Sequence, residues 1–409
     1  MRWNINHWVH RVLDYLIVLM PFYALLVTTG RHYLIDSPGL NLIKDGLIFG
    51  LVALTILANF GQLKSTLSRW RSSSLAQIII LSLSYLVIGL IISANNHLDL
   101  RTIAYGIRYS LLPIIVFLIV RISDYSVRPK LIIYPGIIVS ILAIFQFLIP
   151  ASWLIALGYG EQIGINQSIG PGIDFYRAFS SLGGPNQLAA YLLLPISISL
   201  YSSRETIGLA RYYAGLILMV VGLGLSFSRS GMIALVVIFL VRFSRDWRLS
   251  IWIKLTVGLL LVIISLSFLL YHTNTGVESW LLHGQFDGKL IGSDSERIGH
   301  FKRSIQAVID RPFGYGLGTA GASAYQLGSG FIPENSFLQE MIQVGIVGAS
   351  LIFAVYYQIF RYAYRQRGRI IVGLALGYFV INSLLHGFSD ASLAVVLFAY
   401  LGSRDHIND

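Results

Sequence analysis

The chain alternates between strongly apolar stretches and short polar links along almost its whole length. Most apolar stretches run for about 20 residues, the length at which an α-helix crosses the hydrocarbon core of a bilayer. The pattern predicts an all-α polytopic membrane protein with about twelve transmembrane helices. The expected spans are 12–29, 42–60, 75–93, 103–120, 131–149, 186–201, 209–226, 231–242, 252–271, 335–360, 370–386 and 391–403.

Positive charges mark every second link between these spans. Lys and Arg gather after the second, fourth, sixth, eighth and tenth spans, for example at Arg361, Arg365 and Arg367. Because cytoplasmic loops carry the excess of basic residues, this alternation predicts an even number of spans with both termini in the cytoplasm. The two longest loops, 150–185 and 272–333, then face outward, the second of them between helices 9 and 10. We expect a single integral membrane domain over 1–409, with the first span as a signal anchor.

Composition narrows the chemistry. The chain has 409 residues, of which 55% are hydrophobic and 12% charged, and it contains no cysteine, which excludes disulfides and thiolate metal sites. Its nine histidines show no HExxH or other metal-ligand spacing. The net charge of +11 is explained by basic cytoplasmic loops and by contact with anionic membrane lipid or substrate, rather than by nucleic acid.

Residues 293–348 form the stretch richest in candidate chemistry. Its first part predicts an amphipathic helix over 293–311, in which Ser293 and Glu296 have the spacing of a capping box. Pro312 would end the helix because it has no amide hydrogen to donate. Helical spacing places Ile298, Phe301, Ile305 and Val308 on one apolar stripe, and Arg297, His300, Ser304 and Arg311 on an adjacent polar one.

The helix is followed by GYGLG at 314–318 and then by Glu334 and Asn335, which open the next span. Glycines allow a loop backbone to approach a ligand closely. Cations on a helix, a glycine loop and a carboxylate at a helix start suit an anionic, phosphate-bearing substrate. The alternative is an interfacial helix that only rests on anionic headgroups.

Isolated arginines stand at the outer ends of other spans, where the positive-inside rule does not place them. Arg177 precedes a Gly-Gly-Pro-Asn turn, and Arg229 lies in the short link SFSRSG. Both are candidates for substrate contact. Arg229 could instead reach toward the outer headgroups, and Asn186 could simply cap the span that it opens.

Weaker signals lie elsewhere. His386 and Asp390 fall in the tight outer link HGFSD, where each could orient a sugar hydroxyl or cap a helix. Arg101 and Arg108 could be plain interface anchors. Glu340 lies within the tenth span and is expected to face the bundle interior, as are the glutamines beside it.

Four stretches together resemble the O-antigen ligase and O-antigen polymerase superfamily of bacterial envelope glycan enzymes. They are RAFSSLGGPNQLAAYL at 177–192, FSRSG at 227–231, ERIGHFKRSIQAVIDRPFGYGLG at 296–318 and ENSFLQEMIQVGIVG at 334–348. Their order and the twelve-span topology also resemble that family, so the similarity covers roughly 130–390. Each motif is weak alone, whereas the ordered set is more specific.

The resemblance implies a transfer at the outer face of the bacterial cytoplasmic membrane. A glycan on undecaprenyl pyrophosphate would be the donor, a sugar hydroxyl on a second glycan the acceptor, and a chain-length regulator or flippase a possible partner. The transfer would need no nucleotide, no metal and no other cofactor. Charge accumulates on the leaving pyrophosphate, and arginines stabilise such charge well. Expected pyrophosphate contacts are Arg177, Arg229 and Arg297, with Arg303 and Arg311 as secondary contacts. Expected acceptor or sugar contacts are Glu334 as the proton acceptor, Asn335, Asp390 and His300, the last also an alternative base.

Three functions stay open. A polymerase would join lipid-linked repeat units, and a ligase would move the glycan to a different acceptor. Many ligases of the family carry histidine where this chain has Glu334, which favours a polymerase. A transporter with twelve spans is the third possibility. It is disfavoured because the polar residues collect in outer loops and no pair of Gly/Pro-broken spans is evident.

Overall fold

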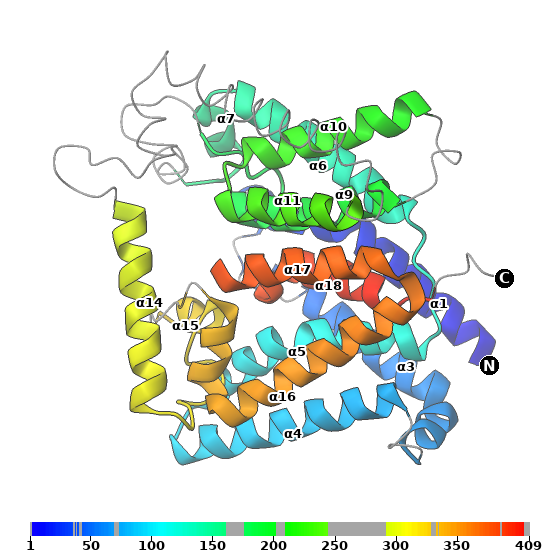
Figure 1. Cartoon of the computed structure of the whole chain (residues 1–409), viewed down its shortest axis with the longest axis vertical. Coiled ribbons are helices and arrows are strands. Elements are labelled where there is room, and N and C mark those ends of the chain that lie inside the picture. Colours follow the sequence, from blue (N-terminus) through cyan, green and yellow to red (C-terminus); the bar gives the residue numbers. More distant parts are fainter. Residues whose placement is uncertain are drawn as a thin grey trace.

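The computed structural model describes residues 2–35, 37, 39–40, 43–68, 73–160, 176–201, 209–243, 292–328, 333, 335–384 and 387–404. Those residues form helices and their connections (Figure 1). The helices of the first half are α1 Arg2–Leu19, η1 Met20–Phe22, α2 Tyr23–Tyr33, α3 Ile43–Ser68, α4 Ser74–Asn95, α5 Leu100–Ile122, α6 Lys130–Leu148, α7 Ala151–Ala156 and α9 Pro185–Tyr201. The second half contains α10 Leu209–Leu225, α11 Arg229–Phe243, α14 Gly292–Asp310, α15 Ala322–Gln326, α16 Ser336–Arg367, α17 Arg369–Leu384, η4 Gly387–Ser389 and α18 Ala391–Gly402.

Six helical segments are long and apolar enough to cross a membrane, within the described part of the chain. They are Ile5–Tyr33, Ile43–Gly61, Ser74–Asn95, Leu100–Ile122, Lys130–Leu148 and Ser336–Arg367, and shorter apolar helices cover Tyr212–Leu225, Arg369–Leu384 and Ala391–Gly402. An all-helical membrane protein is therefore confirmed, while the count of twelve spans stays a prediction. The expected ninth span, 252–271, lies outside the described residues.

The last helix lies at the centre of the bundle. Every residue of α18 from Ser392 to Gly402 is buried, and α18 packs chiefly along α5, with α16, α9 and α1 completing its surroundings. Close approach to α5 depends on Gly402, where a Cβ would lie only 2.9 Å from the carbonyl oxygen of Phe117. Burial on all sides explains why the sequence of α18 is apolar throughout.

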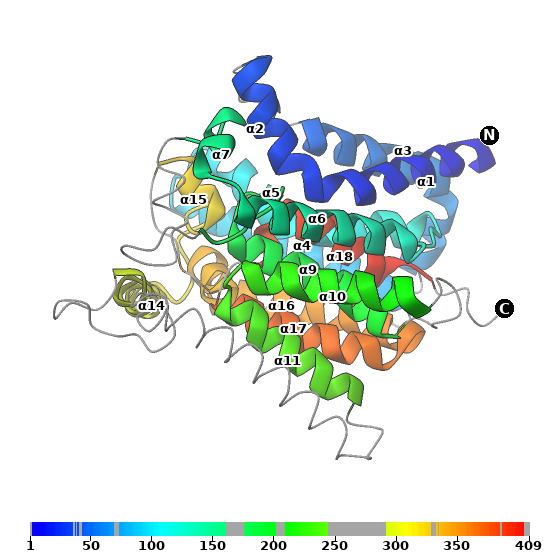
Figure 2. The ribbon, with the colours of Figure 1, turned by 90° about the horizontal axis from the view of Figure 1, so that it is seen from above.

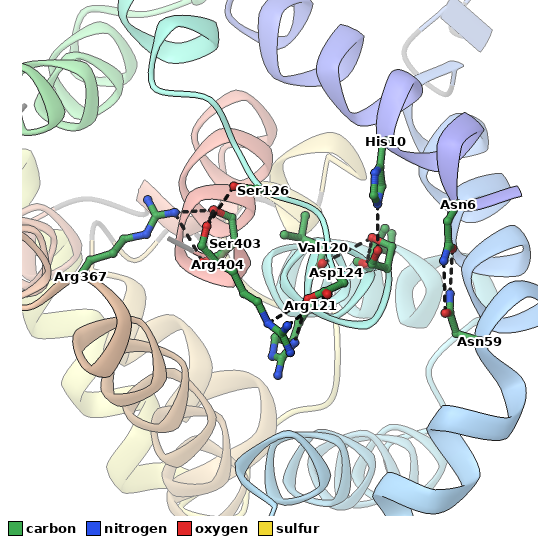
Figure 3. A network of polar contacts seen from close by, with 12 residues as sticks. Asn6, His10, Asn59, Val120, Arg121, Asp124, Ser126, Arg367, Ser403 and Arg404 are labelled. Carbon is green, nitrogen blue, oxygen red and sulfur yellow. Dashed lines mark hydrogen bonds and ion pairs between the residues drawn. The ribbon is translucent and has the colours of Figure 1, made fainter. Parts of the chain in front are cut away.

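A polar network joins both chain ends to the turn after α5 (Figure 3). His10 of α1 lies 2.8 Å from the carbonyl oxygen of Ser123, and Arg404 forms a 2.8 Å ion pair with Asp124. Ser126 also donates to the carbonyl oxygen of Arg404. The first and last helices are thus tied to the same end of the bundle, the arrangement expected for an even number of spans. The assignment of that end to the cytoplasm stays a prediction.

Helix α14 lies at the opposite end and runs across the bundle. The long helices of the bundle lie along the horizontal in Figures 1 and 2, whereas α14 stands upright in Figure 1 and is seen end-on in Figure 2. Its bounds agree with the expected 293–311 to within one residue at each end. Part of the expected apolar stripe is solvent- or lipid-facing, since Phe301 is 49% and Ile305 39% exposed. Ser304, on the expected polar stripe, is fully buried and donates to the carbonyl oxygen of His300.

Candidate functional site

Two of the sequence motifs meet around the side chain of Arg177. Its Nε donates to the carbonyl oxygen of Ser226 at 3.1 Å, and one terminal nitrogen donates to Oδ1 of Asn186 at 3.1 Å. Ser228 donates to the same Asn186 oxygen at 3.0 Å. Asn186 is therefore a shared acceptor for both motifs, beyond the capping role that its position suggested.

Backbone geometry holds this junction together. The amide of Ala178 donates to the carbonyl oxygen of Leu225 at 2.9 Å, so the segment before α9 lies directly along the end of α10. The turn between α10 and α11 is tight, with Phe227 at a positive φ of 48°. Arg229 then begins α11, half-buried at this end of the helix. Arg177 and Arg229 are thereby placed on one local assembly of three helix ends.

The start of α16 is fixed by Asn335. Its side-chain oxygen accepts from the amides of Phe337 and Leu338 at 2.8 and 3.0 Å, the pattern of a helix N-cap. Its amide nitrogen donates to the carbonyl oxygen of Ser383 at the end of α17. Asn335 thus has the capping role that was one of its two expected roles, and contact with a sugar stays a prediction.

Asp390 is a cap as well. Its carboxylate accepts from the amide of Leu393 at 3.0 Å and so begins α18. The preceding turn, η4, is held by Asn382, whose side-chain oxygen accepts from both Ser336 and the amide of Phe388. The starts of α16 and α18 and the end of α17 therefore form one hydrogen-bonded unit.

This unit lies at the same end of the bundle as Arg229. Helices α11 and α17 pack antiparallel, since Gly377 lies against Ile238 and Ala234 while the earlier Gly373 lies against the later Val241. Extending that register brings the C-terminal end of α17 alongside the N-terminal end of α11. The Asn335 cap and the Arg229 turn therefore occupy the same end, which is also the end that carries α14 (Figure 1).

The cations around α14 fall into two places. Arg311, just past the helix, donates to Oδ1 of Asn96 at 2.8 Å and lies over the ring of Tyr315 at 4.8 Å. Arg303 is exposed and lies 3.4 Å from Nδ1 of His300 on the adjacent turn. The backbone of Arg297 belongs to α14, but its side chain lies outside what the structure describes, and so does all of Glu334. The roles expected of Arg297, as a pyrophosphate contact, and of Glu334, as the proton acceptor, stay predictions.

The glycine loop after α14 packs against helices. Leu317 is fully buried, and a Cβ on Gly106 of α5 would lie 2.3 Å from the amide nitrogen of Gly318. Gly318 itself has a positive φ of 85°, which side chains rarely adopt, and its amide donates to Gln343 of α16. The close approach expected between loop backbone and ligand is, in the structure, an approach to α5 and α16.

Two buried charged groups were not among the expected site residues. Asp45 forms a 2.9 Å ion pair with Arg108 and lies 3.7 Å from Lys44, with side chains of Asp45 and Arg108 only 8% and 14% exposed. From the sequence alone, Arg108 could be a plain interface anchor. Its position two turns past the Asp99 cap of α5 is the feature of the sequence that points instead to a buried side chain. Glu340 is buried as expected and accepts from Tyr85 at 2.8 Å and Ser110 at 3.0 Å.

Comparison with known families bears directly on this end of the molecule. A family model described as O-antigen ligase matches residues 214–353. The match supports an O-antigen ligase/polymerase-like family. It spans the Arg229 turn, α14, the glycine loop and the Asn335 cap, which are the parts gathered at one end of the bundle. No curated protein matches the chain.

The family match and the apolar helices bear on location and on substrate class. Together they support a multi-pass protein of the bacterial inner membrane, and the matched family in general implies lipid-linked glycan substrates. Within the described residues no group of three or more His, Cys, Asp or Glu side chains is placed to hold a metal ion.

Proposed function

We propose that this protein is a membrane glycosyltransferase that joins lipid-linked oligosaccharide repeat units into a cell-envelope polysaccharide. The donor is a glycan on undecaprenyl pyrophosphate and the acceptor is a hydroxyl of a second glycan. The observation that carries the proposal is the junction of Arg177, Asn186 and Ser226, because it builds a cationic site from two separate motifs at the end of the bundle that the family match covers.

The reaction places specific demands on these residues. The acceptor oxygen attacks the anomeric carbon of the donor while its proton passes to Glu334. The bond from that carbon to the pyrophosphate oxygen breaks, and the lipid pyrophosphate leaves with the electron pair. Arginines held in advance near the leaving oxygens stabilise this charge without reorganising.

Arg177 is suited to that task because its guanidinium is oriented by Asn186 and by the backbone of Ser226. Arg229 and Arg297 would complete the contact with pyrophosphate, with Arg303 on α14 and Arg311 just past its end as secondary contacts. Asn335 and Asp390 begin two helices at this end, and the acceptor would lie across them. We place the site on the outer face of the membrane, with both termini in the cytoplasm.

A ligase is the second candidate, because the matching family model is described as O-antigen ligase. The donor site would be the same. Only the acceptor would change, from a growing glycan to a different molecule such as a lipid core.

The test uses the purified full-length chain in lipid with an undecaprenyl pyrophosphate oligosaccharide. Wild type is compared with Arg297→Ala, Glu334→Gln and, as a matched control, Lys302→Ala, which removes an exposed cation from the same helix. A ladder of repeats that disappears in the first two variants and persists in the control supports the polymerase. A single transfer that needs an added foreign acceptor favours the ligase, and full activity in both variants would refute the site.

A further inference from the structure

A small pocket lies beside the first turns of α16, and a buried carboxyl group is part of its lining. Ser336, Phe337 and Glu340 of α16, Phe388 of η4 and Tyr109 of α5 are among the residues that line it. Its free space admits a group of about the size of a water molecule. A sugar ring is much too large for it, so whatever enters is one small functional group of a larger molecule or a small ion.

The carboxyl group of Glu340 accepts two hydrogen bonds from neighbouring hydroxyl groups. Tyr85 donates to one carboxylate oxygen and Ser110 to the other. Each oxygen keeps a further lone pair, because an ionised carboxylate accepts about four hydrogen bonds. Among the described residues Glu340 takes part in no ion pair. A buried charge without a counter-ion is costly, so the complement of this pocket is a positive group.

The aromatic lining of the pocket determines which kind of positive group it favours. Tyr109, Phe337, Tyr356 and Phe388 line the same pocket as Glu340, and the rings of Tyr356 and Phe388 pack together with their centres 5.0 Å apart. Aromatic faces attract ammonium ions through their negative quadrupoles. Hard metal cations instead require six or more oxygen ligands, which a pocket lined mainly by carbon does not offer.

We propose that this pocket binds a primary ammonium group, with Glu340 as its counter-ion. The ammonium could be carried by an amino sugar of the glycan or by the ethanolamine headgroup of a membrane lipid. Ser336, which follows the Asn335 cap, lines the pocket, so an amino sugar whose ammonium group is bound there would lie beside the start of α16. The glycan source rests on the proposed function, whereas ammonium binding itself does not.

Binding is tested without turnover, on the full-length chain in nanodiscs of phosphatidylglycerol. The probes are D-glucosamine, N-acetyl-D-glucosamine and potassium chloride, and the readout is the unfolding temperature across each titration, since a ligand that binds only the folded state raises it. The variants are Glu340→Gln and, as a matched control, Asp310→Asn, which makes the same change on an exposed carboxylate. Phe388→Leu removes one aromatic wall and keeps the carboxylate, so it serves should Glu340→Gln fail to fold.

We expect glucosamine to raise the unfolding temperature of wild type and Asp310→Asn, and N-acetyl-D-glucosamine and potassium to have no comparable effect. Half-saturation should move to at least about tenfold higher concentration in Glu340→Gln, because a hydrogen bond to a charged group is lost. Equal responses to both sugars, an equal response to potassium, no response, or an unchanged response in both pocket variants would overturn the proposal.

A lipid arm separates the two sources. If nanodiscs containing phosphatidylethanolamine raise the unfolding temperature and abolish the glucosamine response, the headgroup is the occupant. If the glucosamine response persists there, the glycan is the source. Failure of the transfer assay with intact ammonium binding would reject the proposed function alone.

Discussion

Replacing Gly106 by alanine should disrupt the packing of the glycine loop against α5. The added Cβ would lie 2.3 Å from the amide nitrogen of Gly318 and 2.6 Å from the carbonyl carbon of Leu317. Both atoms belong to the backbone, so no side-chain rotation relieves the contact. The loop must move away from α5, and it carries the connection between α14 and α16.

The magnitude follows from two opposing effects. Alanine favours a helix over glycine by about 1 kcal/mol. Overpacking costs about 1–3 kcal/mol, and a backbone contact this short belongs at the upper end of that range. We expect a net loss of about 2 kcal/mol in the free energy of unfolding, and a loss of transfer activity because the α14 end is displaced.

Gly299→Ala is the matched control. Gly299 lies on α14 with no atom within 4 Å of an added Cβ, so the same change should leave the protein as stable or slightly more so. Unfolding of both variants in mixed micelles with increasing dodecyl sulfate measures the difference. If Gly106→Ala proved as stable as Gly299→Ala, the loop would not be packed against α5, and the reasoning would be refuted.

Three further predictions concern buried charge and helix caps. Arg108→Ala should lower the free energy of unfolding by about 3 kcal/mol, because it leaves Asp45 buried without its closest partner. The double variant Arg108→Met with Asp45→Leu should lower it by less, and measuring the unfolding free energies of both variants tests this. Asn335→Ala should cost about 1 kcal/mol by removing the cap of α16, with Asn335→Asp retaining most of it, as measured by the same unfolding experiment. Hydrogen bonds from Thr102 lower the pKa of Asp99. The cap of α5 is therefore at full strength at neutral pH and weakens as the pH falls through that lowered pKa. The unfolding temperature of wild type should consequently drop more steeply in acid than that of Asp99→Asn.

Local signals in the sequence predicted much of the helical framework. The apolar stretches lie on helices wherever the structure describes them, and Pro312 and Asn335 mark the boundaries that their chemistry requires. These features depend on residues close in sequence, so spacing alone is sufficient to find them.

The candidate site was only partly predictable, because its contacts join residues that are far apart in the sequence. The acceptor of Arg177 is a backbone oxygen of Ser226, and no side-chain pattern reveals which carbonyl a distant turn will present. The ion pair of Asp45 with Arg108 joins the start of α3 to α5 and likewise depends on how helices pack. The glycines of 314–318 were expected to let the loop backbone approach a ligand, which stays a prediction, and only the packing shows that the loop also lies close against helices.

The place of α18 has a consequence for how the protein is made. Helix α18 follows α5, α9 and α16 in the chain, yet it is buried on every side and these helices pack around it. The bundle therefore cannot complete its packing until α18 has entered the membrane. A chain released before Ala391 would hold every arginine of the proposed pyrophosphate site and still lack the helix at the centre of the bundle, so we expect it to leave the facing surfaces of α5, α9 and α16 unpacked.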